Sequence, residues 1–146
     1  MFIFKMQSVL DYRKHMEGKI LDVFSEIKRE LEREKEHLKK IMQAKEDNVA
    51  RLRKMSNETV RAEDIARSVS YIEQLRQDEK KQRIVIDNIK NKLEDKRKEL
   101  VEAVKKRKVM EKLKENYLRE YEEEFLALEQ KNSDEISVLK YGRREK

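Results

Sequence analysis

A periodic stretch near the start of the chain decides the expected fold: residues 20–41 are ILDVFSEIKRELEREKEHLKKI. Apolar side chains recur there every three or four residues, except at Glu34, namely at Ile20, Phe24, Ile27, Leu31, Leu38 and Ile41. A mean spacing of about 3.5 residues places these side chains on one stripe of a helix, as in a coiled coil. The stretch therefore predicts a long helix whose apolar stripe packs against another helix.

The composition agrees with long helices and excludes most other classes. The chain has 146 residues, with 37 Lys or Arg, 31 Asp or Glu, two Gly and no Pro, Cys or Trp. Layered α/β and all-β domains need turn residues about every ten positions, which two glycines cannot supply. The absence of Cys excludes disulfides and thiolate metal sites. Disorder is the competing class for so charged a chain, and sustained periodicity argues against it.

The same heptad register continues along a first arm, residues 8–58, and a register of the same kind runs along a second arm, residues 70–140. The apolar seam positions of the first arm are Ile3, Met6, Leu10, Ile20, Phe24, Ile27, Leu31, Leu38, Ile41, Leu52 and Met55. Those of the second arm are Ile72, Leu75, Ile86, Ile89, Leu93, Leu100, Ala103, Met110, Tyr117, Tyr121 and Leu128. The polar exceptions are Arg13, Glu17, Glu34, Lys45, Asn48, Glu79, Gln82, Lys96, Arg107 and Lys114.

The two arms are separated by a weakly periodic stretch, residues 56–70, with the sequence SNETVRAEDIARSVS. Capping-box patterns at Ser8 and Ser70, each with an acid three residues later, predict the starts of the two helices. We therefore expect one all-α domain over residues 1–146, a single long antiparallel two-helix coiled-coil hairpin. Its tip is expected at residues 59–69, with the bend near residues 60–67.

The alignment of the two arms is predicted from the polarity of facing positions. Antiparallel pairing can shift only in steps of seven, and burying a polar group against an apolar one costs on the order of 1–3 kcal/mol. The alignment with fewest mixed layers places Phe24 opposite Ala103 and Ile41 opposite Ile86, with Lys45 opposite Gln82 and Asn48 opposite Glu79. It centres the bend between residues 63 and 64. One continuous helix in a parallel homodimer is the alternative, and it would bury like charges against each other.

Catalysis is not expected from these residues. The two histidines, His15 and His37, lie on one arm and fall short of the three or four ligands of a zinc site. Gly18 and Gly142 stand alone, so no glycine-rich phosphate loop exists. No apolar run approaches the roughly 18 residues of a membrane span, and no signal peptide is recognisable. We expect a cytoplasmic protein without cofactor, metal or small-molecule substrate.

The second arm carries a basic stretch, residues 80–119, with 15 basic and 7 acidic side chains. It offers nucleic-acid binding as an alternative function. Interleaved acids and the lack of alternating aromatics favour an acidic protein surface as the partner. Tyr71 lies outside the seam beside the bend, where it can serve as an anchor at a protein interface.

The first residues of the chain resemble the start of the FliJ family of flagellar export proteins. The likeness lies in Phe2-Ile3-Phe4-Lys5-Met6-Gln7-Ser8-Val9-Leu10-Asp11-Tyr12-Arg13. It continues in the basic segment Arg107-Lys108-Val109-Met110-Glu111-Lys112-Leu113-Lys114 and at Asp134-Glu135. The stalk proteins of virulence type III secretion systems are the nearest confusable family.

The resemblance implies a non-catalytic central stalk and adaptor of the flagellar type III export apparatus. Such a protein docks in the hexameric export ATPase FliI, promotes its assembly, contacts the export gate FlhA and escorts export chaperones. It would be monomeric alone and peripheral to the inner membrane at the flagellar base. The implied gate contacts are His37, Ile41, Ala44, Asn48, Tyr71 and Leu75. The implied ATPase-ring contacts are Phe4, Leu10, Arg13, Tyr117, Tyr121 and Phe125.

Overall fold

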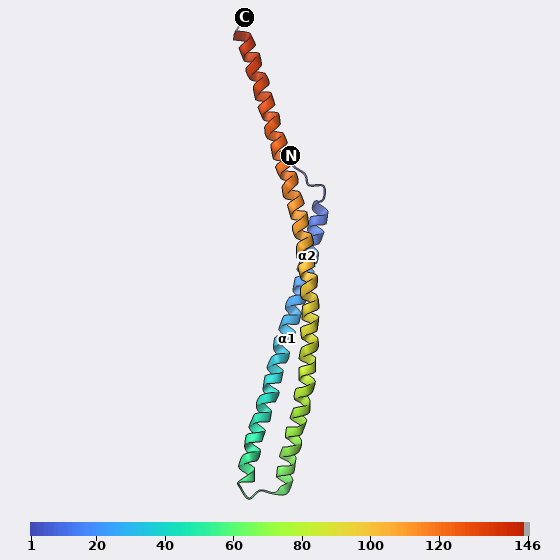
Figure 1. Ribbon diagram of the computed structural model, residues 1–146, viewed down its shortest axis with the longest axis vertical. Coiled ribbons are helices and arrows are strands. Elements are labelled where there is room, and N and C mark those ends of the chain that lie inside the picture. Colours follow the sequence, from blue (N-terminus) through green and yellow to red (C-terminus); the bar gives the residue numbers. More distant parts are fainter. Residues whose placement is uncertain (145–146) are drawn as a thin grey trace. The chain divides into compact units, whose positions relative to one another are not determined.

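The computed structural model describes residues 1–144, and these residues form two helices that pack against each other as an antiparallel hairpin (Figure 1). Helix α1 is Gln7–Ser56 and helix α2 is Ala62–Arg144. No strand is present in the part of the chain that is described. The expected all-α two-helix hairpin is therefore confirmed.

Two compact parts make up the hairpin. The tip part is Lys19–Leu100, and the terminal part combines Met1–Gly18 with the chain from Val101 onward. The core of the tip part is a cluster of Ile27, Leu31, Ile86 and Ile89, against which Leu38 and Leu93 pack. Burying side chains of this size contributes about 1.5–3 kcal/mol each, so this cluster joins α1 to α2 within the tip part.

The heptad registers predicted from the sequence are confirmed position by position over most of both helices. Every predicted seam position from Leu10 to Met55 is buried or half-buried, as is every one from Ile72 to Lys114. Four outer positions differ, because no opposing helix covers them. Those four, Ile3, Met6, Tyr117 and Leu128, are 72%, 40%, 45% and 57% exposed.

The turn is shorter and earlier than the sequence suggested. Residues 57–61 connect the helices and overlap the expected bend, residues 60–67, only at its start. The amides of Asn57 and Glu58 donate to the carbonyls of Lys54 and Met55 at 3.1 and 3.3 Å, which closes α1. The expected tip, residues 59–69, is corrected because α2 already begins at Ala62.

The two expected capping boxes do not start the helices. Ser70 lies inside α2, whose first turn carries Glu63 and Asp64, acids that the positive end of the helix dipole favours. Ser8 lies inside α1, where the Gln7 amide donates to the Phe4 carbonyl at 3.1 Å. Phe4 is only 6% exposed, so the chain is anchored just ahead of the helix and α1 begins directly after this anchor.

The predicted alignment of the arms is also corrected, by a hydrogen bond in the tip part. The Gln82 amide donates to the backbone carbonyl of Glu34 at 3.0 Å. In the predicted alignment, Glu34 lies level with Leu93, eleven residues from Gln82, or about 16 Å along the axis. A glutamine side chain cannot span that distance, so Ile41 does not lie level with Ile86.

An alignment shifted by one heptad fits the contacts of the tip part. It places Glu34 level with Ile86 and Lys45 level with Leu75. Gln82, which donates to Glu34, then lies four residues before the level of Glu34. Glu79, which accepts from Lys45 at 2.6 Å, lies four residues after the level of Lys45. The two offsets are equal and opposite, so the shifted alignment lies midway between the two contacts. The same shift centres the bend on residue 60, within the observed turn.

Cysteine pairs test this alignment, because the chain has no natural Cys. Leu31→Cys with Ile89→Cys should form an intramolecular disulfide under mild oxidation, since both positions belong to one packed cluster. Leu31→Cys with Lys96→Cys, the pair of the original alignment, should stay reduced, because the two are offset by about 10 Å. Non-reducing gels show which pair forms a disulfide. Preferential formation of the disulfide between positions 31 and 96 would support the alignment predicted from the sequence instead.

Candidate interaction surfaces

The two sets of contact residues expected from the family resemblance lie in different parts of the hairpin. All six expected gate contacts belong to the tip part, and all six expected ring contacts belong to the terminal part. Each set therefore has its own local geometry.

The expected gate contacts are unequally accessible. Tyr71 is 49% exposed and His37 is exposed, whereas Ile41, Ala44 and Asn48 are half-buried. Leu75 is only 6% exposed and packs in the seam. Asn48 turns its amide back to its own helix and donates to the Ala44 carbonyl at 2.6 Å. Tyr71 is thus the member of this set that offers a large apolar surface to a partner.

An ion-pair cluster crosses the seam of the tip part close to these residues. Lys45 donates to Glu79 at 2.6 Å, and Arg83 donates to the other oxygen of Glu79 at 2.9 Å. The Glu79 side chain is 13% exposed and that of Lys45 is 28% exposed. The hydrogen bond from Lys45, followed by that from Arg83, lowers the pKa of Glu79 below its ordinary value. This carboxylate is therefore held ionised inside the helix pair.

A second polar contact in the seam joins Gln82 to Glu34. The Gln82 amide donates both to the Glu34 carbonyl and to its carboxylate, and Gln82 is 7% exposed. Sequence reasoning paired Lys45 with Gln82 and Asn48 with Glu79, and the structure replaces both pairs. Within residues 1–143, no buried side-chain nitrogen or oxygen lacks a hydrogen-bond partner.

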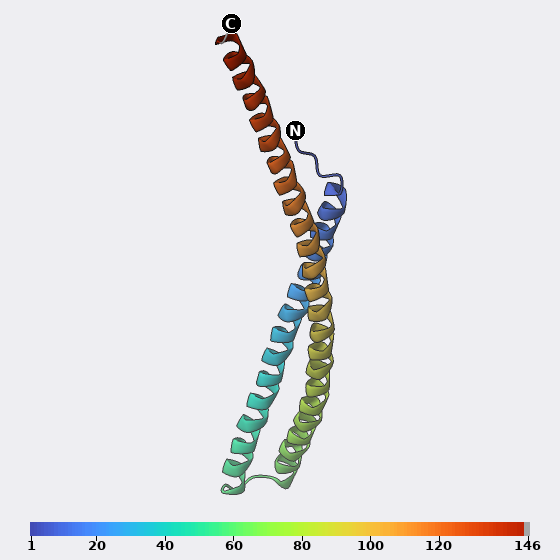
Figure 2. The same cartoon turned by 45° about the horizontal axis from the view of Figure 1, so that its top comes forward.

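The expected ring contacts include two residues that stabilise the fold instead of facing solvent. Leu10 is 1% exposed and Phe4 is 6% exposed. The Phe4 ring lies 6.0 Å from the Tyr117 ring in a tilted arrangement, a geometry that aromatic pairs prefer. Arg13 is half-buried, and its guanidinium lies 5.8 Å from the Tyr12 ring. Phe4 and Leu10 thus hold the N-terminal segment in place. Both ribbon views show this segment beside α2 (Figures 1 and 2).

Three aromatic rings continue this contact along α2. Phe2 lies 5.6 Å from Tyr121, which in turn stacks on Phe125 at 6.5 Å. Phe125 is 51% exposed. The aromatic series therefore passes from the buried Phe4 and the half-buried Phe2 to a surface that a partner can reach.

Arg107, which lies within the basic stretch of the second arm, faces α1 in the terminal part. It donates hydrogen bonds to Glu17 of α1 and to Glu111 of its own helix, and these bonds raise its pKa above the usual value. Other basic residues of the stretch pair with acids one turn away, such as Arg97 with Glu94 at 2.7 Å. Engaged cations of this kind are less available to phosphates, which weighs against nucleic-acid binding.

The apolar surface at the end of α2 was not recognised from the sequence. Every residue from 122 to 143 is exposed, including Leu128, Ile136 and Leu139 at 57%, 54% and 65%. Sequence reasoning assigned Leu128 to the seam. The lengths of the two arms could have revealed this exposure, because a first arm that starts at residue 8 cannot cover residues of the second arm beyond about 120.

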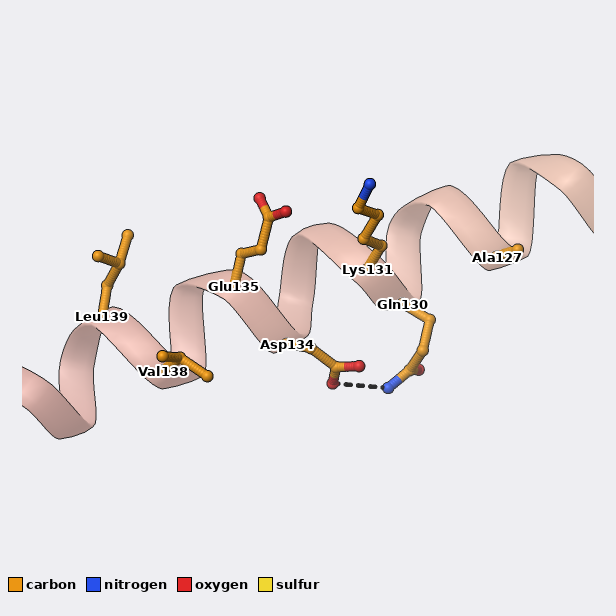
Figure 3. A pocket seen from close by; sticks show the side chains of 7 residues that line it. All are labelled: Ala127, Gln130, Lys131, Asp134, Glu135, Val138 and Leu139. Atoms are coloured by element: carbon orange, nitrogen blue, oxygen red, sulfur yellow. Dashed lines mark hydrogen bonds between the residues drawn. The ribbon is translucent and has the colours of Figure 1, made fainter.

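A shallow groove lies along this end of α2 (Figure 3). All seven lining residues come from one helix, and among them Gln130 donates to Asp134 at 3.0 Å. A groove on a single helix cannot enclose a small molecule. In the described residues, no group of three or more possible metal ligands was found. No helix within residues 1–144 is both long and apolar enough to cross a membrane.

The family model described as flagellar FliJ protein matches residues 1–146. No curated protein and no solved structure matched the chain.

The Glu79 cluster predicts a pH dependence of stability. A lowered folded-state pKa adds stability above the unfolded value of about 4.3, and this stability is lost as pH falls through the folded pKa. Glu79→Gln should therefore lower the urea midpoint at pH 7 and have a smaller effect at pH 3, where the wild-type carboxyl is also neutral. Circular dichroism at both values measures it.

The matched control is Glu36→Gln, which changes an exposed carboxylate of α1 with no ion pair among the described residues. Its midpoints should follow the wild type at both pH values. An equal loss at pH 7 and pH 3 for Glu79→Gln would show that the ionised form contributes nothing.

Proposed function

Because the chain belongs to the flagellar FliJ protein family, it is a component of the flagellar type III export apparatus, and we propose that it acts there as a non-catalytic stalk and adaptor. In this role it docks in the hexameric export ATPase FliI, promotes ring assembly and activity, and couples the ring to the export gate FlhA. The observation that carries the proposal is the family match over residues 1–146. The separation of the two candidate surfaces into two parts of the hairpin supports it.

The terminal part is the proposed ring-binding element. Support comes from the series Tyr117, Tyr121 and Phe125, in which Tyr117 and Phe125 are exposed and Tyr121 is half-buried. Aromatic side chains bury large areas at low cost in conformational entropy, and they are enriched at binding hot spots. Five Glu lie within residues 120–129 of the same helix and would orient the docking through complementary charge. Phe4 and Leu10 contribute indirectly by holding the N-terminal segment in place.

The tip part is the proposed gate-binding element. Tyr71 is its anchor, because it is half exposed and lies on α2 one turn before Leu75, which is buried. His37 is the exposed member on α1, and its imidazole lies 3.8 Å from the Glu34 carboxylate. Ile41, Ala44 and Asn48 would form the rim of this surface, since they are half-buried on one face of α1.

Escort of export chaperones and a cytoplasmic position at the inner-membrane side of the flagellar base complete the proposal. Family membership supports both, because the family is named for the flagellar apparatus. The charged surfaces outside the two contact sets are the remaining area on which a chaperone can be carried.

Stimulation of the export ATPase tests the ring-binding element. Phe125→Ala should raise the concentration needed for half-maximal stimulation of FliI about tenfold, because losing an aromatic anchor typically costs more than 1 kcal/mol. Val138→Ala, at a 70% exposed position on another face of the same helix, should behave as the wild type. If the unmodified protein neither binds nor stimulates its ATPase, the stalk assignment fails.

Direct binding to FlhA tests the gate-binding element. Tyr71→Ala should weaken binding about tenfold for the same reason, while ATPase stimulation stays unchanged. Val69→Ala is the control, since Val69 is 50% exposed two residues away and points to another side of α2. Equal effects of both variants would remove Tyr71 as the anchor. Calorimetric titration gives both affinities.

A further inference from the structure

The end of α2 has an apolar stripe that nothing in the hairpin covers. Its members are Phe125, Leu128, Asn132, Ile136 and Leu139, here called the C-terminal stripe. The four apolar members are 51–65% exposed. With about 3.6 residues per turn, all five fall within roughly a quarter of the helix circumference. Their intervals of three, four, four and three residues follow an 11-residue spacing, which keeps an apolar stripe on one face of a nearly straight or slightly right-handed helix pair.

The spacing of the stripe residues is symmetric about Asn132. Leu128 and Ile136 lie four residues before and after it, and Phe125 and Leu139 lie seven residues before and after it. We infer that the C-terminal stripe packs against the same stripe of a second copy of this chain, antiparallel and centred on Asn132. Phe125 then faces Leu139 of the second copy, and Leu128 faces Ile136. This inference is independent of the proposed stalk function.

Charges beside the stripe agree with this antiparallel arrangement. Glu122 and Lys140 lie on the same flank of the stripe. In the proposed pair, Lys140 of one copy lies only two residues along the axis from the position that faces Glu122 of the other copy. Lys131 and Glu135 lie on the other flank, also within two residues of each other's level. The twofold axis repeats each contact, which gives four opposite-charge pairs between the copies. All four side chains are exposed in the described hairpin.

Neighbouring alignments fit the sequence less well. A shift of one heptad in one direction places Phe125 against Asn132 and Leu128 against Glu129. A shift in the other direction places Leu139 against Asn132 and Leu128 against Arg143. Burying a polar or charged group against an apolar one is unfavourable, so both are disfavoured. Asn132 facing itself supplies a central polar layer, a feature that fixes register at some cost in stability.

The pair should be weak, since it consists of five layers with one polar layer at the centre. We expect a dissociation constant on the order of 50 µM, so that dilute protein is monomeric and concentrated protein is dimeric. The hairpin stays intact in both states. This arrangement therefore differs from the parallel dimer of continuous helices, in which the hairpin would not form.

Sedimentation equilibrium tests the inference between about 5 and 500 µM, a range that brackets this constant. The apparent mass should rise from 17.8 kDa toward twice that value. Ile136→Glu should weaken association at least thirtyfold, because it places a charge in the seam, whereas Val138→Glu should change it less than about twofold. Both positions are exposed, so neither variant disturbs the hairpin core. A monomer throughout, or equal effects of the two variants, overturns the inference.

Charge reversal tests the flanking contacts. Lys140→Glu should weaken association, and adding Glu122→Lys to the same chain should restore it, because both pairs between positions 122 and 140 are then reversed. A double variant that associates no better than Lys140→Glu would contradict the proposed alignment.

Disulfide trapping tests the direction, because any introduced Cys is the only one in the chain. A mixture of Phe125→Cys and Leu139→Cys chains should form the mixed disulfide. Phe125→Cys chains alone should not join, since the two copies of position 125 lie about 21 Å apart in the antiparallel pair. Faster joining of Phe125→Cys chains to each other would indicate a parallel pair and overturn the inference.

Discussion

The fold of the tip part depends on the contact between Ile27 and Leu31 of α1 and Ile86 and Ile89 of α2. Almost half of the residues are charged, so few side chains can be withdrawn from water. In a two-helix coiled coil, the few apolar side chains are buried in a narrow seam and the many charged side chains remain exposed to water. Two long helices are individually marginal in water, and the seam is what stabilises them together. Turn position, accessible residues and candidate surfaces all follow from which positions the seam occupies.

Polar residues inside the seam decide how the two helices are aligned. Glu79 accepts hydrogen bonds from Lys45 and Arg83, and Gln82 bonds the backbone and side chain of Glu34. A shift by one heptad would separate Gln82 from Glu34 and leave a buried amide without partners, which costs about 1–3 kcal/mol. Apolar layers of Leu and Ile tolerate such a shift better, because one branched side chain replaces another. The polar contacts therefore supply register, a property suited to an element that must transmit position without slipping.

Sequence reasoning predicted which residues enter the seam but not which residues face each other. Periodicity is a local property, so it identified positions such as Leu10, Ile86 and even the polar Gln82 correctly. The alignment was wrong by one heptad because facing residues were scored only at the same level. Long side chains such as Lys45 and Gln82 reach partners a turn away, which makes a mixed layer less costly than assumed. The early start of α2 was not predicted, because a capping box was expected there. Glu63 and Asp64 in the first turn, directly after Ala62, favour a helix start without one. The burial of Phe4 could not be predicted, because Phe4 lies outside the heptad seam and its burial depends on how the N-terminal segment packs.

The end of α2 differs from the tip part in that no second helix of the described chain covers its apolar side chains. A helix without tertiary contacts gains nothing from an apolar stripe, and exposed Phe and Leu side chains in a row favour association. Residues 122–143 nevertheless carry Phe125, Leu128, Ile136 and Leu139 on one side. Covering this stripe with another chain would remove apolar surface from water and stabilise the helix at the same time, so binding and helix stability are coupled there. Any two partners that use the stripe must then compete for it, because one helical face can pack against only one other helix at a time. Self-association and capture by a larger assembly become alternative states of one surface, with protein concentration setting the balance between them.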